Sequence, residues 1–207
     1  MKKVSVIIPF RNDRGWLNQA INSVEKQTYP NIELIISQGN YNVSTNLNKG
    51  IEKSTGDFIK YLCDDDILPT DSIEKSLTGF KYPITKFIHG NAICFRGEIV
   101  STGYKYEPIV KHINLTNMLY RNQVHGTTLM YKREVFENYG MFNESLWTGE
   151  EYEFNLRLLY NNVKCGYVDE VLAFYRMHIK QKSIGISDKE YQRKRTEAIE
   201  KFKNWYR

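Results

Sequence analysis

Three adjacent aspartates, Asp64, Asp65 and Asp66, form the group in this sequence that is best suited to chemistry. Neighbouring carboxylates repel one another, so a fold that gathers them at the end of a strand needs a compensating cation. Mg²⁺ and Mn²⁺ prefer carboxylate oxygens and are commonly held by one or two protein carboxylates together with substrate phosphates. We therefore expect a divalent-cation site here. The alternative is a solvated acidic turn that caps the following helix.

A second acidic cluster, Glu150-Glu151-Tyr152-Glu153, begins a predicted helix. Carboxylates in the first turn are favoured by the helix dipole, which is a purely structural explanation. The catalytic alternative is that one carboxylate is a general base, which takes the proton from a hydroxyl nucleophile.

Polar residues also follow two other predicted strands. Arg176 could contact phosphate or pair with an acidic residue, and His178 could bind a metal or phosphate. Near the N-terminus, Arg11 and Asn12 follow the first strand, where Asn12 suits either a helix cap or a nucleotide contact.

The elements that must position these residues alternate in the first half of the chain. Strand-like runs are expected at 4–8, 33–36 and 58–62, with helices at 16–24 and 43–51 and a third that starts at a capping box in 71–74. This βαβαβα order predicts an α/β fold with a mainly parallel sheet. Ligands of such sheets bind beyond the carboxyl ends of the strands, so the polar segments 9–12, 37–40 and 63–66 should share one crevice.

The second half has a less regular pattern. We expect strands at 86–89, 92–95, 98–101 and 127–131, short strands around Tyr167 and Leu172, and helices at 113–120, 133–139, 150–160 and 189–206, with a polar loop at 180–187. A hairpin turn is predicted at Arg96-Gly97. The last helix is basic and could pack on the domain, lie on a membrane surface or lead into a further domain.

Length and composition limit the classes of protein. The 207 residues, 41% hydrophobic, suit one soluble domain, and no apolar run is long enough for a membrane span. The three cysteines lack zinc or disulfide spacing, which favours a reduced, cytoplasmic setting with at most peripheral membrane contact. A net charge of +5 suits a diphosphate ligand or an anionic membrane surface. We expect no nucleic-acid partner, since no recognisable module for one is present.

The order and spacing of several segments resemble family 2 of the nucleotide-sugar glycosyltransferases, which have the GT-A fold. The resemblance covers residues from about 4 to 178 and rests on segments 4–12, 27–35, 48–51, 56–59, 62–66 with Pro69, 149–154 and 175–178. It implies one GT-A domain over 1–207, with a nucleotide-sugar half at about 1–100, a smaller, antiparallel acceptor half at about 101–180 and a basic helix at about 188–206.

The resemblance also assigns roles to residues. It implies a metal-dependent, inverting transfer in which Glu151 is the base and Mn²⁺ or Mg²⁺ is the cofactor. The implied metal ligands are Asp64, Asp65, Asp66 and His178. The implied donor-binding residues are Pro9, Phe10, Arg11, Asn12, Ser37, Gln38, Gly39, Asn48, Asp64, Asp65 and Arg176.

The sequence departs from the family pattern at three places. Ser37-Gln38 stands where two aspartates usually precede the glycine, and Gln38 can still donate and accept hydrogen bonds to a base. A UDP-sugar is the expected donor, with GDP- and dTDP-sugars as alternatives. Cys63 stands where the acidic run often begins, which leaves open which aspartates ligate the metal. Glu150-Glu151 replaces the common Glu-Asp pair.

The acceptor is expected to be a hydroxyl of a glycan, lipid-linked or protein-linked molecule. The resemblance places 89–91 and 125–127 on the acceptor side. One alternative function is a non-catalytic nucleotide- or glycan-binding domain. Another is a sugar nucleotidyltransferase, which should carry a glycine-rich, basic loop after the first strand. Residues 9–12 do not resemble such a loop.

Overall fold

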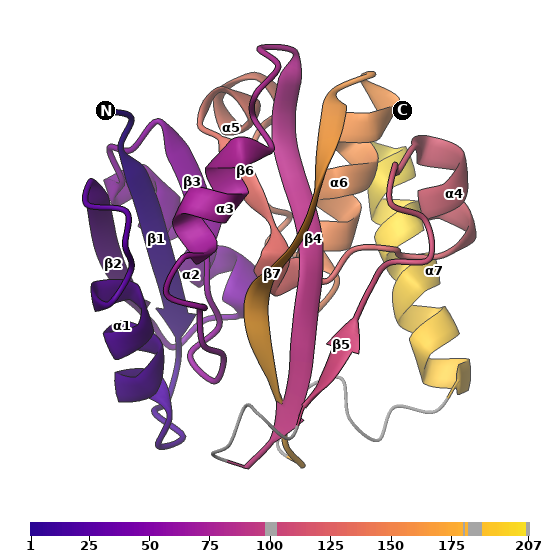
Figure 1. Ribbon diagram of the computed structural model, residues 1–207. Coiled ribbons are helices and arrows are strands. Elements are labelled where there is room, and N and C mark those ends of the chain that lie inside the picture. Colours follow the sequence, from indigo (N-terminus) through magenta and orange to yellow (C-terminus); the bar gives the residue numbers. More distant parts are fainter. Residues whose placement is uncertain (98–102, 180, 182–187, 206–207) are drawn as a thin grey trace.

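The first half of the chain folds as the parallel unit that its apolar pattern predicts. The computed structural model describes residues 1–97, 103–179, 181 and 188–205. The first strand, β1, pairs in parallel with both β2 and β3, so these three strands end at one edge of the sheet (Figure 1). The elements of this half are β1 (Val4–Phe10), α1 (Leu17–Glu25), β2 (Ile32–Gln38), α2 (Val43–Lys53), β3 (Phe58–Tyr61) and α3 (Ser72–Thr78).

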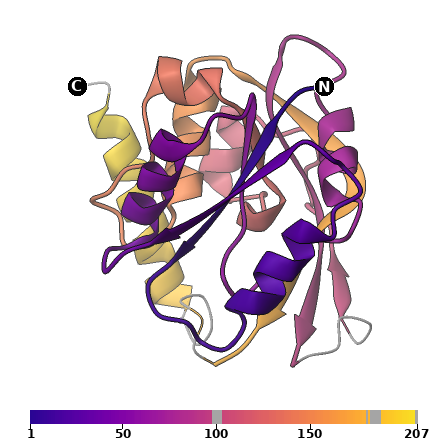
Figure 2. The ribbon, with the colours of Figure 1, turned by 90° about the vertical axis from the view of Figure 1, so that its left-hand side faces the viewer.

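The two faces of β1 are buried under different helices. Val6 and Ile8 belong to an apolar cluster that includes Ile73 of α3, whereas Ile7 packs in a second cluster with Leu47 of α2. Figure 2 shows α1 and α2 on opposite sides of β1. Since successive side chains of a strand point to opposite faces, an apolar run without alternation becomes a strand that is covered on both sides.

The second half adds the antiparallel part of the sheet. Its elements are β4 (Thr85–Arg96), β5 (Tyr104–Tyr106), α4 (Leu115–Tyr120), a 3₁₀ turn (Gly126–Thr128), β6 (Met130–Lys132), α5 (Glu134–Tyr139), α6 (Glu150–Tyr160), β7 (Lys164–Met177) and α7 (Asp188–Asn204). The strands pair in the order β2-β1-β3-β6-β4-β5, and β7 runs parallel to β4. The predicted α/β class, with a mainly parallel sheet and a smaller antiparallel part, is confirmed.

The strands of the second half are longer than the sequence pattern predicts. The expected strands 86–89 and 92–95 are one strand, β4, and those around Tyr167 and Leu172 are both parts of β7. Gly90 lies between the two expected strands, and it allows a close approach between β4 and β7. A Cβ at Gly90 would come within 2.7 Å of the Val168 carbonyl oxygen and of a Leu172 methyl group.

Two smaller predictions were wrong, and three fall partly or wholly outside the described residues. The segment 127–131 begins in the 3₁₀ turn, and only its end joins β6. Asp71 makes no capping hydrogen bond, because its carboxylate pairs with Lys75 at 3.0 Å. The strand expected at 98–101, most of the loop at 180–187 and the last residue of the helix at 189–206 lie outside the described residues.

The basic helix α7 packs against α6. Ala198 and Phe202 are buried there, and the ring of Phe202 lies 5.6 Å from that of Tyr160. The guanidinium of Arg157, in α6, lies 4.2 Å from the ring of Trp205. In the part of the chain that the structure describes, no helix combines the length and apolarity that crossing a membrane would need.

Candidate functional site

The three aspartates lie close together at the carboxyl edge of the sheet, directly after β3. Asp64 and Asp65 are 8% exposed and Asp66 is 1% exposed. Burial raises the pKa of Asp64, and burial together with Asp65 raises the pKa of Asp66 well above the usual carboxyl value. One oxygen of Asp66, Oδ2, is buried without a hydrogen-bond partner. A group of carboxylates in this condition favours a nearby cation.

Among the described residues, Arg14 places the positive charge closest to these carboxylates, although no sequence motif indicated it as a site residue. Its Nη2 lies 2.7 Å from Oδ1 of Asp64 and 2.8 Å from Oδ2 of Asp65. Burial of the guanidinium opposes its charge, but these two carboxylates outweigh burial and raise the pKa of Arg14. The available signal was the position of Arg14, which follows Arg11 in the polar loop after β1.

His178 is placed where a metal ligand was expected. Its Nε2 lies 2.9 Å from Oδ2 of Asp65, and its ring lies 4.4 Å from the ring of Trp16. The end of β7 thereby brings His178 to the aspartates that follow β3, although the two segments are far apart in the sequence. The side chain of His178 is 11% exposed, so it can reach a ligand held by Asp65.

Arg176 lies beneath the aspartates rather than in front of them, which corrects its expected position as a diphosphate contact. Its side chain is only 1% exposed. The guanidinium donates to the Asp65 carbonyl oxygen at 2.9 Å and to Oε1 of Gln19 at 2.5 Å, and it also bonds the Gly97 carbonyl. Its backbone N–H donates to Oδ1 of Asp66 at 2.9 Å. Arg176 therefore supports the backbone that carries the acidic group.

The donor atoms at this place fit a hard divalent cation. One ligating atom from each of Cys63, Asp65 and Asp66 lies within 4.8 Å of the others. Burial, with the nearby carboxylates, raises the pKa of the Cys63 thiol well above its usual value, so the oxygens are the better ligands. Carboxylate oxygens are the ligands that Mg²⁺ and Mn²⁺ prefer, and the unpartnered Oδ2 of Asp66 is one of them.

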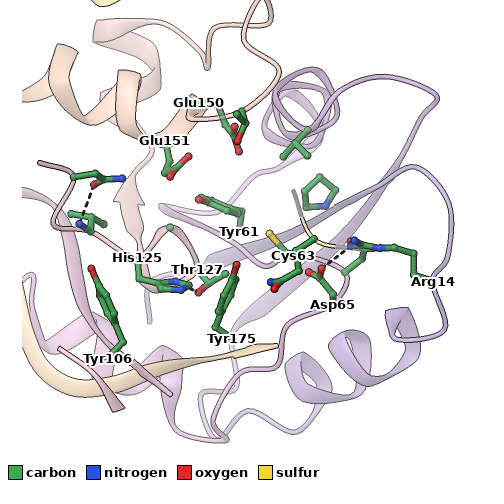
Figure 3. A pocket seen from close by; sticks show the side chains of 18 of the residues that line it. Arg14, Tyr61, Cys63, Asp65, Tyr106, His125, Thr127, Glu150, Glu151 and Tyr175 are labelled. Carbon is green, nitrogen blue, oxygen red and sulfur yellow. Dashed lines mark hydrogen bonds and ion pairs between the residues drawn. The ribbon is translucent and has the colours of Figure 1, made fainter. Parts of the chain in front are cut away.

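Two cavities meet at Asp64. The smaller, of about 280 Å³, is lined by the loop after β1 and by Tyr41 and Trp147. The expected donor-binding residues Pro9, Phe10, Arg11 and Asn12 all line it. The larger, of about 560 Å³, extends from Asp64 and Asp65 to α6 (Figure 3). A long ligand could therefore occupy both cavities and pass the acidic group between them.

The four remaining donor-binding candidates are not among the residues that line these cavities. Ser37 is buried, Gln38 is exposed on the surface, and Gly39 packs against the side chain of Asn46. Ser37 and Gln38, which stand in place of the family's aspartates, thus line neither cavity.

Asn48, the fourth of these candidates, fixes a loop instead. Its Nδ2 donates to the Phe142 carbonyl at 2.9 Å and to Oε1 of Glu144 at 2.8 Å, and its Oδ1 accepts from the Phe142 N–H at 3.1 Å. These bonds join α2 to the segment that leads into α6.

Glu150 and Glu151 line the larger cavity from the start of α6. Gly149, with φ of 79°, turns the chain into this helix. A Cβ at Gly126 would lie 2.5 Å from the Tyr61 hydroxyl and 3.3 Å from Cγ of Glu151, so the glycine leaves room for both side chains. Burial and then Glu151 raise the pKa of Tyr61 well above its usual value, which keeps this phenol protonated.

Glu153 is separated from the other carboxylates of its cluster. It is fully buried on the other side of α6, where Oε1 lies 2.8 Å from Nε of Arg157. Only Glu150 and Glu151 are thus available to a molecule in the cavity.

The two segments expected on the acceptor side, 89–91 and 125–127, differ in whether they line the larger cavity. His125 and Thr127 line the larger cavity, whereas His89 is fully buried and does not line it. Tyr106 and Tyr175 also line this cavity. Tyr106 lies in a three-residue strand, and no pattern in the sequence indicated that it faces a ligand.

The sequence of this chain is similar to those of known glycosyl transferases. The family described as Glycosyl transferase family 2 matches residues 5–41 and 37–140. An uncharacterized glycosyltransferase of Rickettsia conorii is 28% identical over 220 residues, covering 89% of this chain and 36% of the relative. One of Haemophilus influenzae is 27% identical over 210 residues, covering 87% of this chain and 70% of the relative. This chain therefore spans about a third of the length of the Rickettsia protein.

Two groups of solved structures are similar in fold. S. aureus TarS 1-349, in complex with UDP-GlcNAc, superposes with a TM-score of 0.70 at 16% identity over 92% of this chain and 64% of that chain. The mannosyltransferase PcManGT from Pyrobaculum calidifontis, in complex with GDP-Man and Mn²⁺, gives a TM-score of 0.64 at 12% identity over 88% of this chain and 58% of that chain. At these identities the likeness shows the fold, which is the one expected from the sequence.

Proposed function

This chain belongs to glycosyl transferase family 2 and has the GT-A fold, and from that premise we propose that it transfers a sugar from a nucleoside-diphosphate sugar to an acceptor hydroxyl. The observation that carries the proposal is the larger cavity, which has an acidic group at one end and a helix-borne glutamate at the other. Transfer requires these two functions: one to hold a diphosphate leaving group and one to accept a proton.

The donor spans both cavities in this proposal. Its nucleoside occupies the smaller cavity against the loop after β1, and its diphosphate lies beside Arg14 and the aspartates. The complexes of TarS with UDP-GlcNAc and of PcManGT with GDP-Man support a donor of this class. A UDP-sugar is favoured. GDP- and dTDP-sugars are the alternatives, because Gln38 lies on the surface and no acidic residue follows β2 directly.

The proposed ligands of a divalent cation are oxygens of Asp64, Asp65 and Asp66, with His178 beside them. Mn²⁺ or Mg²⁺ bound there supplies positive charge for the diphosphate. The Mn²⁺ of PcManGT supports this choice of ion. Arg14 adds a second positive charge from the protein itself, at the boundary of the two cavities.

Glu151 is the proposed base. An acceptor hydroxyl in the larger cavity gives its proton to the Glu151 carboxylate while its oxygen bonds to the anomeric carbon of the donor sugar. The bond between that carbon and the diphosphate oxygen breaks in the same step, and the nucleoside diphosphate leaves with the electron pair. Attack from the side opposite to the leaving group inverts the anomeric configuration.

A donor screen tests this proposal. Thermal-shift measurements with UDP-, GDP- and dTDP-sugars should show stabilisation that requires Mn²⁺ and disappears with excess chelator. Release of nucleoside diphosphate from the stabilising donor should also require the metal. A protein that binds a donor but never cleaves it, with any acceptor, would instead be a non-catalytic binding domain. Stabilisation by no nucleotide sugar would contradict the proposal altogether.

A further inference from the structure

One wall of the larger cavity consists of three aromatic rings from separate parts of the chain. Tyr106 comes from β5, His125 precedes the 3₁₀ turn, and Tyr175 lies near the end of β7. The His125 ring centroid lies 4.3 Å from that of Tyr175 and 5.4 Å from that of Tyr106, with interplanar angles of 71° and 68°. Such edge-to-face contacts hold the three rings as one group, which we call the aromatic wall.

The aromatic wall is fixed and carries no charge at neutral pH. Nδ1 of His125 lies 2.9 Å from Oγ1 of Thr127, and burial lowers the pKa of this imidazole to about 4. The Tyr106 hydroxyl bonds the Gln123 carbonyl at 3.4 Å. Because these side chains are already ordered, a ligand that contacts them loses little affinity to their immobilisation.

The cavity wall around Glu150 and Glu151 is polar. Figure 3 shows these two carboxylates on one side of the cavity, with the three rings on the other. Thr148 and Asn122 also line the cavity and offer hydroxyl and amide groups. An occupant should therefore have an apolar face for the rings and hydroxyl groups for the polar side chains. A pyranose ring has both, because its axial C–H bonds form flat patches that suit the negative face of an aromatic ring.

The carboxylates of Glu150 and Glu151 argue against a phosphorylated acceptor in their part of the cavity. Among the described residues that line it, four are carboxylates (Asp64, Asp65, Glu150 and Glu151) and two are arginines (Arg14 and Arg121). Arg14 is already paired with Asp64 and Asp65, and Arg121 lies exposed on the surface. A phosphate beside Glu150 and Glu151 would be repelled by both.

We propose that the aromatic wall is the acceptor subsite and that it binds an uncharged sugar ring, the terminal residue of a glycan, with one of its hydroxyls directed at Glu151. This inference rests on the proposed function, which gives the cavity its donor. An acyclic polyol phosphate has no ring face to stack and carries the wrong charge. A serine or threonine side chain has no ring face to stack on the aromatic wall.

Saturation-transfer NMR on the full chain, with UDP and Mn²⁺ present, tests the subsite directly. The probes are the methyl glycosides of glucose, galactose, mannose and N-acetylglucosamine, with ribitol 5-phosphate and N-acetylserine methylamide as competing classes. We expect at least one glycoside to bind, with the strongest saturation on its ring C–H protons. Tyr106→Ala should weaken the binding of that glycoside by about three- to tenfold, because an aromatic contact is lost. Tyr106→Phe keeps the ring and should change the affinity less than about twofold.

The controls separate this inference from the proposed function. Donor binding, measured on the same samples, reports on the proposed function and should be unchanged in both Tyr106 variants. If Tyr106→Ala does not fold, Tyr175→Leu provides the same comparison from β7. Tighter binding of ribitol 5-phosphate or of the serine derivative than of every glycoside would overturn the inference. A glycoside affinity that is unchanged in Tyr106→Ala, or in Tyr175→Leu where that variant is used, would also overturn the inference. The same holds if no probe binds to a protein that still hydrolyses its donor.

Discussion

The two ends of the larger cavity are built in different ways. At the acidic end, Asp64, Asp65 and Asp66 are consecutive residues after one buried strand, and Arg14 and Arg176 reach them from other parts of the chain. At the aromatic end, each functional side chain comes from a different element. The first end depends on one short segment and its buried supports. The second depends on the long-range arrangement of β5, α6, β7 and the 3₁₀ turn.

The largest expected effect compares the two carboxylates that begin α6. Glu151→Gln removes the proposed base but keeps its size and hydrogen-bonding atoms, so the transfer rate should fall by about 10² to 10⁴-fold. The stabilisation of the protein by donor and Mn²⁺ should not change, because the acidic end is untouched. Steady-state kinetics and thermal shift, measured side by side, distinguish the two quantities.

Glu150→Gln is the matched control for this experiment. Glu150 lines the same cavity and is 9% exposed, so loss of its charge perturbs the local field to a similar extent. We expect a decrease in rate of less than about tenfold. A larger decrease in rate for Glu150→Gln than for Glu151→Gln would contradict this assignment and identify Glu150 as the base.

The sequence predicted the acidic end far better than the aromatic end. Strands that are covered on both faces leave continuous apolar runs, and the polar residues after β1 and β3 mark where those runs end. The start of α6 at Glu150 was also predicted, because carboxylates gather in the first turn of a helix. These features depend on residues that are neighbours in the chain.

The features that the sequence did not predict depend on distant neighbours. Arg176 resembled a phosphate contact, yet its guanidinium donates to groups of Gln19, Asp65 and Gly97. Asn48 resembled a donor contact, yet it binds the backbone of Phe142. No local sequence pattern indicates that Tyr106 lines a cavity. The sequence does not show whether a polar or aromatic side chain faces a ligand or another segment of the chain. The tertiary packing determines which of the two it contacts.

The second prediction concerns Arg176, the buried arginine whose hydrogen bonds hold the backbone of the acidic end. Arg176→Met should lower the free energy of unfolding by about 3 kcal/mol, because it leaves the Asp65 and Gly97 carbonyls and the Gln19 side chain without their donor. Urea denaturation measures this change. The aromatic end should retain its glycoside affinity in the folded variant, whereas donor affinity should fall because the backbone of Asp65 is no longer held.

Arg121→Met is the control for the loss of an arginine. Arg121 lies exposed at the other end of the cavity, so its replacement should change the free energy of unfolding by less than about 0.5 kcal/mol. Equal destabilisation by both substitutions would mean that Arg176 does not support the acidic end in the way its hydrogen bonds indicate.

The smallest expected effect lies at the aromatic end and depends on pH. Burial lowers the pKa of His125 from 6.5 to about 4, so the unfolded chain binds a proton at this position more readily than the folded one. The resulting stability is fully present above about pH 6.5 and is lost as the pH falls toward 4. The rings of Tyr106 and Tyr175 pack against this imidazole.

His125→Phe keeps an aromatic ring in the wall but cannot be protonated. Between pH 7 and pH 5 the wild-type protein should therefore lose about 1 to 2 kcal/mol more free energy of unfolding than the variant does. The buried aspartates of the acidic end titrate alike in both proteins, so the difference between the two urea-denaturation series isolates His125. Parallel pH profiles would show that the imidazole is more open to water than its packing against the two tyrosines indicates. The aromatic wall would then be a less rigid binding surface than the acidic end.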